Sequence, residues 1–325
     1  EKLVLIDGHS ILNRAFFGIP DLTNSEGLHT NAVYGFLNIL FKILEEENPQ
    51  YLAVAFDVHA PTFRHEMFEE YKGTRKPMAD ELREQVPLMK EMLHAMGVTI
   101  VELAGFEADD LLGTIAVLGE KKGMEVSIVS GDRDLLQLAT DHIQIRIPKT
   151  KKTGTEIENY YAKDVKERYL VTPKEFIDVK ALMGDTSDNI PGVPGIGEKT
   201  ATALIEKYKN IETIHEYATE VKPPRAGKNI VEYWEQAVLS KTLATINVNV
   251  PIQTEPINFT LEKAKIDGIT SLYTQKAYLL CKQLEFKQFL QRFSSAEATK
   301  QNINIEECFK KLTSKKEIIK LFSKI

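Results

Sequence analysis

The chain has 325 residues, of which 43% are hydrophobic and 27% charged, with a formal net charge of −6 at pH 7. This length allows about two domains, and the composition is typical of a globular protein. No apolar stretch approaches the ~20 residues of a bilayer span, so we expect no membrane association. The two cysteines, Cys281 and Cys308, form neither a metal-binding spacing nor a disulfide framework, which favours the cytoplasm.

The first half of the chain alternates short apolar runs with helical patterns. The runs, which predict buried strands, are residues 3–6, 52–56, 98–103 and 126–129. Helical spacing of apolar residues covers 31–46, 82–96 and 108–120, and residues 143–160 predict a hairpin with a basic turn. This succession predicts a parallel sheet with right-handed crossovers, followed from about residue 162 by a mainly helical region.

Acidic residues follow each of the four apolar runs. They are Asp7, Asp57, then Glu107, Asp109 and Asp110, then Asp132 and Asp134. Any single one is explained by helix capping, but one helix start needs only one cap. The carboxyl ends of parallel strands meet at one sheet edge, where so many carboxylates would repel each other without cations. An all-oxygen ligand set favours Mg²⁺ or Mn²⁺, which indicates metal-dependent phosphate chemistry.

Two further patterns favour nucleic acid as the substrate. Asp185 and Asp188 precede a glycine-rich hairpin that opens a helix bearing Lys199, an arrangement suited to DNA backbone contact. Residues 62–77 interleave basic and aromatic side chains and should overhang the acidic edge, where they could clamp phosphates and stack on bases. A hairpin between helices is more often a plain connector, and a charged run is usually a solvated face.

These motifs together resemble the flap endonuclease family, in particular the 5′-nuclease domains of bacterial DNA polymerases I. The resemblance runs from residue 3 to about 293. It includes Tyr71-Lys72-Gly73-Thr74-Arg75, Glu107-Ala108-Asp109-Asp110, Ser130-Gly131-Asp132-Arg133-Asp134 and Gly184-Asp185-Thr186-Ser187-Asp188-Asn189-Ile190-Pro191-Gly192.

The resemblance implies a Rossmann-like (PIN-like) α/β nuclease core with a helical arch, and a helix–three-turn–helix DNA-binding region. It implies cleavage of DNA, or of RNA in a primer, from the 5′ end and at 5′ flaps by a two-metal-ion mechanism. The protein would be a monomer that binds nicked or branched duplexes. We expect the core at 1–165, with the arch at about 62–90. The helical region would be 166–293, with its helix-hairpin-helix at 185–207. A linker (294–304) and the start of a proofreading-exonuclease-like module (305–325) would follow, so no DNA synthesis is expected.

The same resemblance assigns roles to individual residues. One metal ion would be held by Asp7, Asp57, Glu107 and Asp109, and the second by Asp132, Asp134, Asp185 and Asp188, with Asp110 near both. Arg14, Lys72 and Arg75 would contact the scissile phosphate, and Tyr71 could stack on an unpaired base. DNA contacts, with a monovalent ion such as K⁺ at the hairpin, would come from Arg64, Gly192, Val193, Gly195, Ile196, Gly197, Lys199 and Thr200.

Two rival functions remain at this point. A phosphatase with an Asp-x-Asp start is compatible with Asp7, although His9 stands where the second acid is required. A catalytically inactive DNA-junction-binding protein of the same fold is the other alternative, although it would have no reason to retain a repulsive acidic cluster.

Overall fold

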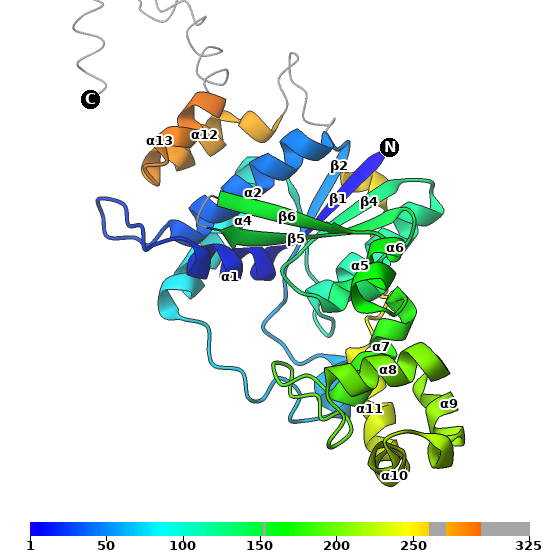
Figure 1. Cartoon of the computed structure of the whole chain (residues 1–325). Helices are drawn as coiled ribbons and strands as arrows, with labels where there is room; N and C mark the ends of the chain where they lie inside the picture. The colour runs from blue at the N-terminus through cyan, green and yellow to red at the C-terminus, as the bar shows by residue number, and fades with distance from the viewer. Residues whose placement is uncertain (152–153, 260–270, 294–325) are drawn as a thin grey trace, which may run out of the picture. The chain divides into compact units, whose positions relative to one another are not determined.

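The computed structural model describes residues 1–151, 154–259 and 271–293 (Figure 1). The chain divides into two compact units, Glu1–Leu272 and Tyr273–Ile325. The boundary that we expected near residue 165 therefore lies inside the first unit, and residues 273–293 belong to the second. The expected linker and the expected start of a following module lie outside the described residues.

A six-stranded sheet forms the centre of the first unit, in the order β3-β2-β1-β4-β5-β6. Strands β1 to β5 pair in parallel, and β6 pairs antiparallel to β5. The predicted parallel sheet and terminal hairpin are thus confirmed. The strands are β1 (Lys2–Asp7), β2 (Tyr51–Ala55), β3 (Thr99–Val101), β4 (Glu125–Val129), β5 (Ile143–Lys151) and β6 (Gly154–Tyr160).

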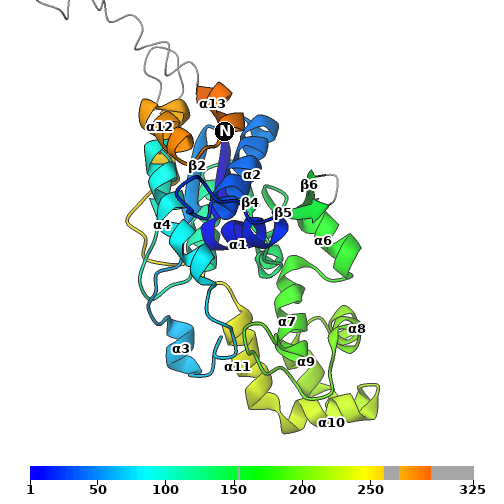
Figure 2. The same ribbon diagram turned by 90° about the vertical axis from the view of Figure 1, so that its left-hand side faces the viewer.

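Helices cover both faces of this sheet. Helix α5 (Ala108–Lys121) packs on one face, and α1 (Gly8–Gly18), α2 (Asn31–Glu47) and α4 (Asp80–Ala95) pack together on the other (Figures 1 and 2). The three predicted helices agree with α2, α4 and α5 to within two residues. Helix α1 was not predicted. It begins directly after β1, where Asp7 caps it by accepting a hydrogen bond from the Ser10 N–H at 3.0 Å.

Gln85 anchors helix α4 to the core. Its Oε1 accepts hydrogen bonds from the N–H groups of Ala32 (2.8 Å) and Val33 (3.3 Å) at the start of α2. Thr30, the N-cap residue of α2, makes no side-chain capping bond. A fully buried side chain from α4 therefore satisfies helix-end donors that would otherwise lie unpaired.

The segment between β2 and α4, residues 62–79, is named here the arch segment. It contains only the short helix α3 (Phe63–Met67), which lies beside α11 (Figure 2), followed by irregular chain up to α4. Of the expected helical arch at about 62–90, residues 80–90 belong to α4, which packs against α1 and α2.

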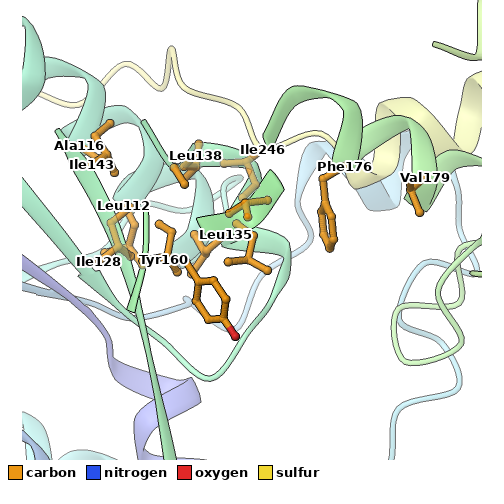
Figure 3. Packing of buried hydrophobic residues seen from close by; sticks show 14 of the residues in the cluster. Leu112, Ala116, Ile128, Leu135, Leu138, Ile143, Tyr160, Phe176, Val179 and Ile246 are labelled. Carbon is orange, nitrogen blue, oxygen red and sulfur yellow. The ribbon is translucent and has the colours of Figure 1, made fainter. Parts of the chain in front are cut away.

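The rest of the first unit is mainly helical, as predicted. Aliphatic side chains of α5, β4, β5 and the short helix η1 pack together, and Phe176 and Val179 extend this core along α7 (Figure 3). The elements are η1 (Asp134–Leu138), α6 (Ala162–Tyr169), α7 (Pro173–Met183), α8 (Glu198–Tyr208), α9 (Ile211–Glu216), η2 (Ala218–Glu220), α10 (Pro224–Glu232), α11 (Trp234–Ala244) and η3 (Pro256–Phe259). The short helix η5 (Ser271–Tyr273) spans the boundary between the two units.

The second unit is described from Tyr273 to Phe293. It contains α12 (Gln275–Gln283), α13 (Lys287–Leu290) and η6 (Gln291–Phe293). Across the described parts of both units, no helix has the length and apolar character needed to cross a membrane.

Candidate active site

The acidic strand ends surround one cavity of about 580 Å³. Cationic side chains share its wall with the carboxylates, so the cavity is mixed in charge. The acids that line it are Asp7, Asp57, Glu107, Asp109, Asp132 and Asp134, and the cations are Arg14, Lys72, Arg75, Arg133 and Lys180. The prediction that four separate strands bring their acids to one sheet edge is confirmed for these six positions.

Asp7 is held at the end of the central strand. Besides capping α1, it accepts a hydrogen bond from the Ser130 hydroxyl at 2.7 Å. Burial raises the pKa of Asp7 to about 6, with smaller contributions from the charges of Asp57 and Asp132, and the two hydrogen bonds oppose this rise. A carboxylate at this position is therefore costly at neutral pH until a positive charge joins it.

Asp57 is more exposed than Asp7 and is oriented by two neighbours. Its Oδ1 accepts a hydrogen bond from the N–H of Ala108 at 2.8 Å, at the start of α5. Its Oδ2 lies 3.4 Å from Nδ1 of His9. Burial alone would raise the pKa of Asp57, but the contacts with His9 and Ala108 lower it overall, so Asp57 is the carboxylate that ionises readily.

Asp109 and Asp134 are two acids of the cluster whose pKa values are raised. Burial, followed by the charges of Asp7 and Asp132, raises the pKa of Asp109 well above its ordinary value. Burial and the charge of Asp132 raise the pKa of Asp134 to about 7. Like-charge repulsion of this kind favours either proton uptake or a bound cation.

Lys180 is a site residue that the sequence analysis missed. Its Nζ lies 2.7 Å from Asp134 and 2.5 Å from Asp185. Burial would lower the pKa of Lys180, but the two acids outweigh this effect and raise it overall. A signal was available, because Lys180 occupies an apolar position of α7, in the i, i+4, i+7 series from Phe176 to Met183. A lysine on the buried face of a helix requires an acidic partner.

The arch segment places two cations against the acids. Lys72 Nζ lies 2.7 Å from Glu107 Oε1, and Arg75 pairs with Asp188. Lys72 has a φ of +55°, a conformation that non-glycine residues rarely adopt, and the hydrogen bond from its N–H to the Asp188 carbonyl at 2.8 Å holds it there. Lys72 and Arg75 therefore face the cavity, as expected.

Asp185 and Asp188 do not line the cavity. Burial would raise the pKa of Asp185, but hydrogen bonds from Lys180 and Ser187 lower it to about 2. Asp188 is buried and pairs with Arg75. The structure thus places both acids directly behind the cavity, each in an ion pair with one of the cations that line it.

The expected roles of Arg64 and Asp110 need correction. Asp110 is fully buried and does not line the cavity, unlike the other acids of its segment. Arg64 binds it through two bonds of 2.8 Å each and also donates to the carbonyls of Leu243 and Thr245. With its N–H groups engaged and its side chain buried, Arg64 presents nothing to DNA.

The expected stacking role of Tyr71 is also wrong for this structure. Its side chain is buried, and its hydroxyl lies 3.2 Å from both Glu107 and Asp188. Burial, with the charges of these two acids, raises the pKa of the Tyr71 hydroxyl, so it acts as a hydrogen-bond donor. Tyr71 thus connects Glu107, which lines the cavity, to Asp188, which does not.

Arg14 lines the cavity as expected. It comes from α1, one residue after Asn13 and four after Ser10, and both of these residues also line the cavity. Among the described residues, its Nε is buried and makes no hydrogen bond, and burial lowers its pKa. A buried donor without a partner is suited to an anionic ligand.

The glycine hairpin divides into an inner and an outer side. Gly192, Val193 and Ile196 are buried, and the Gly192 N–H donates to the Ser240 hydroxyl at 3.0 Å. The outer side exposes Gly195, Gly197 and Lys199, with Thr200 half-buried. Gly197 is the N-cap of α8 and provides no side-chain acceptor, so the first N–H groups of α8 point outward without a cap. Of the hairpin residues expected to contact DNA, Gly195, Gly197 and Lys199 are therefore the exposed ones.

The chemistry of the cavity wall fits hard divalent cations, although the ligands are not gathered around one point. Throughout residues 1–151, 154–259 and 271–293, no three His, Cys, Asp or Glu side chains converge as a finished metal site. The donor set is nonetheless all oxygen, and three of its acids have raised pKa values. Side-chain movement is needed to complete a coordination sphere.

Residues 2–170 match the family described as 5′-3′ exonuclease, N-terminal resolvase-like domain, and residues 171–267 match 5′-3′ exonuclease, C-terminal SAM fold. The chain belongs to the 5′–3′ exonuclease family. This is the enzyme family that the sequence motifs indicated, and the phosphatase alternative is set aside.

Relatives and solved structures agree with this assignment. DNA polymerase I of Bacillus caldotenax is 46% identical over 295 residues, which are 91% of this chain and 32% of the relative. DNA polymerase I of Bacillus subtilis is 45% identical, over 92% of this chain and 33% of the relative. The chain spans about a third of the length of these relatives.

Two solved structures show the same fold at low sequence identity. T5 5′-exonuclease with bound divalent metal ions (zinc) has a TM-score of 0.63 at 22% identity, covering 88% of this chain and 99% of that one. The catalytic core of Rad2 in complex with a DNA substrate has a TM-score of 0.56 at 15% identity, covering 87% of each chain. The predicted α/β nuclease fold is confirmed.

Proposed function

We propose that this chain hydrolyses DNA phosphodiesters from the 5′ end and at 5′ flaps, as the 5′-nuclease part of a bacterial DNA polymerase I. The observation that carries the proposal is a single cavity with six carboxylates and five cations in its wall. Such a wall can hold divalent cations and a phosphate together. Primer removal, with RNA as an alternative substrate strand, and DNA repair in the cytoplasm would follow from that activity.

Two Mg²⁺ or Mn²⁺ ions are the cofactors that the donor set fits. Bound there, they would stabilise charge on the phosphate and lower the pKa of a water molecule. The first would be held by Asp7, Asp57, Glu107 and Asp109. The second would take Asp132 and Asp134, with Asp185 and Asp188 joining only when their ion pairs with Lys180 and Arg75 open. Asp110 would act indirectly, because Arg64 holds it.

Three cations of the wall are assigned to the phosphate. Lys72 and Arg75 reach the cavity from the arch segment, and Arg14 reaches it from α1. Their N–H groups would donate to the non-bridging oxygens, where negative charge increases in the transition state. Because Lys72 and Arg75 are paired with Glu107 and Asp188, the phosphate must exchange partners with these acids.

The duplex next to the cleavage site would be gripped by the outer hairpin. Structural neighbours that share the fold include a T5 flap endonuclease complex with DNA and metal ions. In this chain the exposed Gly195, Gly197 and Lys199 and the half-buried Thr200 would contact the DNA backbone, with a K⁺ ion at the hairpin. The protein would act as a monomer. Replacing Lys199 with Gln should lower affinity for duplexes of any sequence. It should also reduce the slope of log affinity against log salt concentration by about one unit.

The experiment is cleavage of a 5′-labelled 5′-flap DNA with Mg²⁺ and then with EDTA. Release of short 5′ products only with Mg²⁺ supports the proposal. An intact substrate together with a clear shift on a gel overturns the catalytic assignment and favours the inactive binding protein. The same assay is repeated with Mn²⁺ and with Ca²⁺. It separates a requirement for the positive charge of any divalent cation from a requirement for a metal ion that takes part in the reaction.

A further inference from the structure

Helix α10 presents a basic surface beside the hairpin that the assignments above do not use. Its exposed side includes Arg225 and Lys228, and Lys222 is exposed just before the helix begins. Within the part of the chain that the structure describes, none of the three makes an ion pair. In a chain with a net charge of −6, three neighbouring unpaired cations are a local exception.

The opposite side of α10 fixes the direction of these cations. Ala226, Gly227 and Ile230 are buried, and a Cβ at Gly227 would lie 2.0 Å from the carbonyl oxygen of Ala218 in η2. So close an approach leaves the helix little freedom to rotate about its axis. Arg225 and Lys228 are three residues apart and lie opposite the buried side, so they point away from the protein together.

Asn229 connects this surface to the hairpin. Its Nδ2 donates a hydrogen bond to the Pro194 carbonyl at 2.7 Å, between Gly192 and Gly195. Arg225 and Asn229 are four residues apart and share one side of α10. The hairpin therefore lies next to the side that carries Arg225. The exposed acid Glu232 lies in the last turn on the same side, four residues after Lys228, and among the described residues the two form no ion pair.

We infer that Lys222, Arg225 and Lys228 form a second phosphate-binding surface, which contacts the duplex held by the hairpin. This inference rests on the proposed DNA-binding function. The ligand is the sugar–phosphate backbone of double-stranded DNA, because point cations without a shaped pocket read charge and not sequence. The start of α10 adds a favourable helix dipole, and its N-cap Pro223 offers no side-chain acceptor that would compete.

The test compares the full chain with the double variant Arg225→Gln/Lys228→Gln. Equilibrium binding to a nicked duplex in EDTA is measured across a series of KCl concentrations. Loss of two phosphate contacts should lower the slope of log affinity against log salt by about two units, and affinity by at least about tenfold. Single-turnover cleavage at saturating substrate should not change, because neither residue lines the acidic cavity.

Two controls make the outcome decisive. Lys121→Gln removes an exposed cation at the far end of α5, and Lys199→Gln removes one on the hairpin itself. The inference is overturned if the double variant keeps the parent slope, or if Lys121→Gln lowers it equally. In both cases a reduced slope for Lys199→Gln would leave the proposed function intact. Failure of the parent chain to bind any duplex would overturn both.

A shortened duplex arm provides the last check. Once the arm no longer reaches α10, the parent and the double variant should bind equally, while Lys199→Gln should still bind more weakly. A difference that persists at every arm length would mean that the substitutions act through the protein and would overturn the inference.

Discussion

Arg64 and Asp110 form a bidentate ion pair, with both N···O distances at 2.8 Å, between two side chains that are almost completely buried. Arg64 comes from α3 and Asp110 from the first turn of α5. The same guanidinium donates to the Leu243 carbonyl near the end of α11. One side chain therefore joins the arch segment, the nuclease core and the helical region.

Replacing Arg64 with Met should destabilise the protein by about 3–5 kcal/mol, because it leaves Asp110 as a buried charge without its partner. Urea unfolding measures this change. Arg83→Met, which breaks an exposed pair with Asp80, is the matched control and should have little effect. Duplex binding by the folded fraction of Arg64→Met should be normal, and a specific loss of DNA affinity would restore the contact role that the structure denies.

Asp7→Asn should abolish turnover yet stabilise the protein in EDTA. The pKa of Asp7 is raised to about 6, so the folded state holds its proton more tightly than the unfolded state. The ionised acid then lowers stability progressively as pH rises from about 4 through 6. Asn keeps the cap on α1 and avoids this cost, so thermal unfolding at pH 8 in EDTA should show a gain of about 1–3 kcal/mol.

The gain from Asp7→Asn should vanish near pH 4, where the parent acid is protonated in the folded state. Added Mg²⁺ should narrow the difference at pH 8 by stabilising the parent. Equal stabilities at pH 8 in EDTA would show that Asp7 is not strained, and DNA affinity should be retained throughout.

Lys180→Met should have the opposite effect on stability. Burial would raise the pKa of Asp185, but Lys180, together with hydrogen bonds from Ser187, lowers it to about 2. The pair with Lys180 therefore stabilises the fold above about pH 4, and this stabilisation is lost as pH falls toward 2. The variant should therefore be less stable by about 2 kcal/mol at pH 7, and the difference should shrink at pH 3. Lys174→Met, at an exposed position of the same helix, is the control, and a pH-independent difference would contradict the ion-pair explanation.

Two hairpin glycines should respond differently to alanine. At Gly192, with φ +62°, a Cβ would lie 2.3 Å from the backbone nitrogen of Gly184, so the hairpin must distort. At Gly195, with φ +78°, the nearest atom would be 3.5 Å away, and the cost is conformational strain of about 1–2 kcal/mol. Guanidinium unfolding should rank Gly192→Ala well below Gly195→Ala, and duplex affinity should follow the same order.

The acidic cavity could be predicted because it depends on strand ends, which short apolar runs locate well. Asp7, Asp57, Glu107 and Asp132 needed no knowledge of side-chain direction, only the geometry of a parallel sheet. Arg64 and Tyr71 were misplaced for the converse reason. A basic and aromatic run has the same sequence whether it faces solvent or folds inward, and only the buried acids decide between these.

Lys180 and α1 were missed for local reasons. Lys180 stands at an apolar position of α7, which made it look like part of the helix pattern. Its partner Asp185 lies five residues later, but its partner Asp134 comes from η1, so a short window shows only half of the ion-pair arrangement. Helix α1 follows β1 without a loop, since Asp7 both ends the strand and caps the helix. Because one residue serves both roles, no turn or loop residues separate the strand from the helix in the sequence.

The way Gln85 holds α4 has a consequence for the two cations that the arch segment places at the cavity. The arch segment is attached at both ends. At one end it continues into α4, which Gln85 joins to the start of α2, and at the other end α3 is joined to α5 by Arg64. Between these ends the chain is attached a third time, because Tyr71 is buried and the Lys72 N–H donates to the Asp188 carbonyl. The position of Lys72 and Arg75 at the cavity thus depends on three separate parts of the fold, and loosening any one of them should displace both cations.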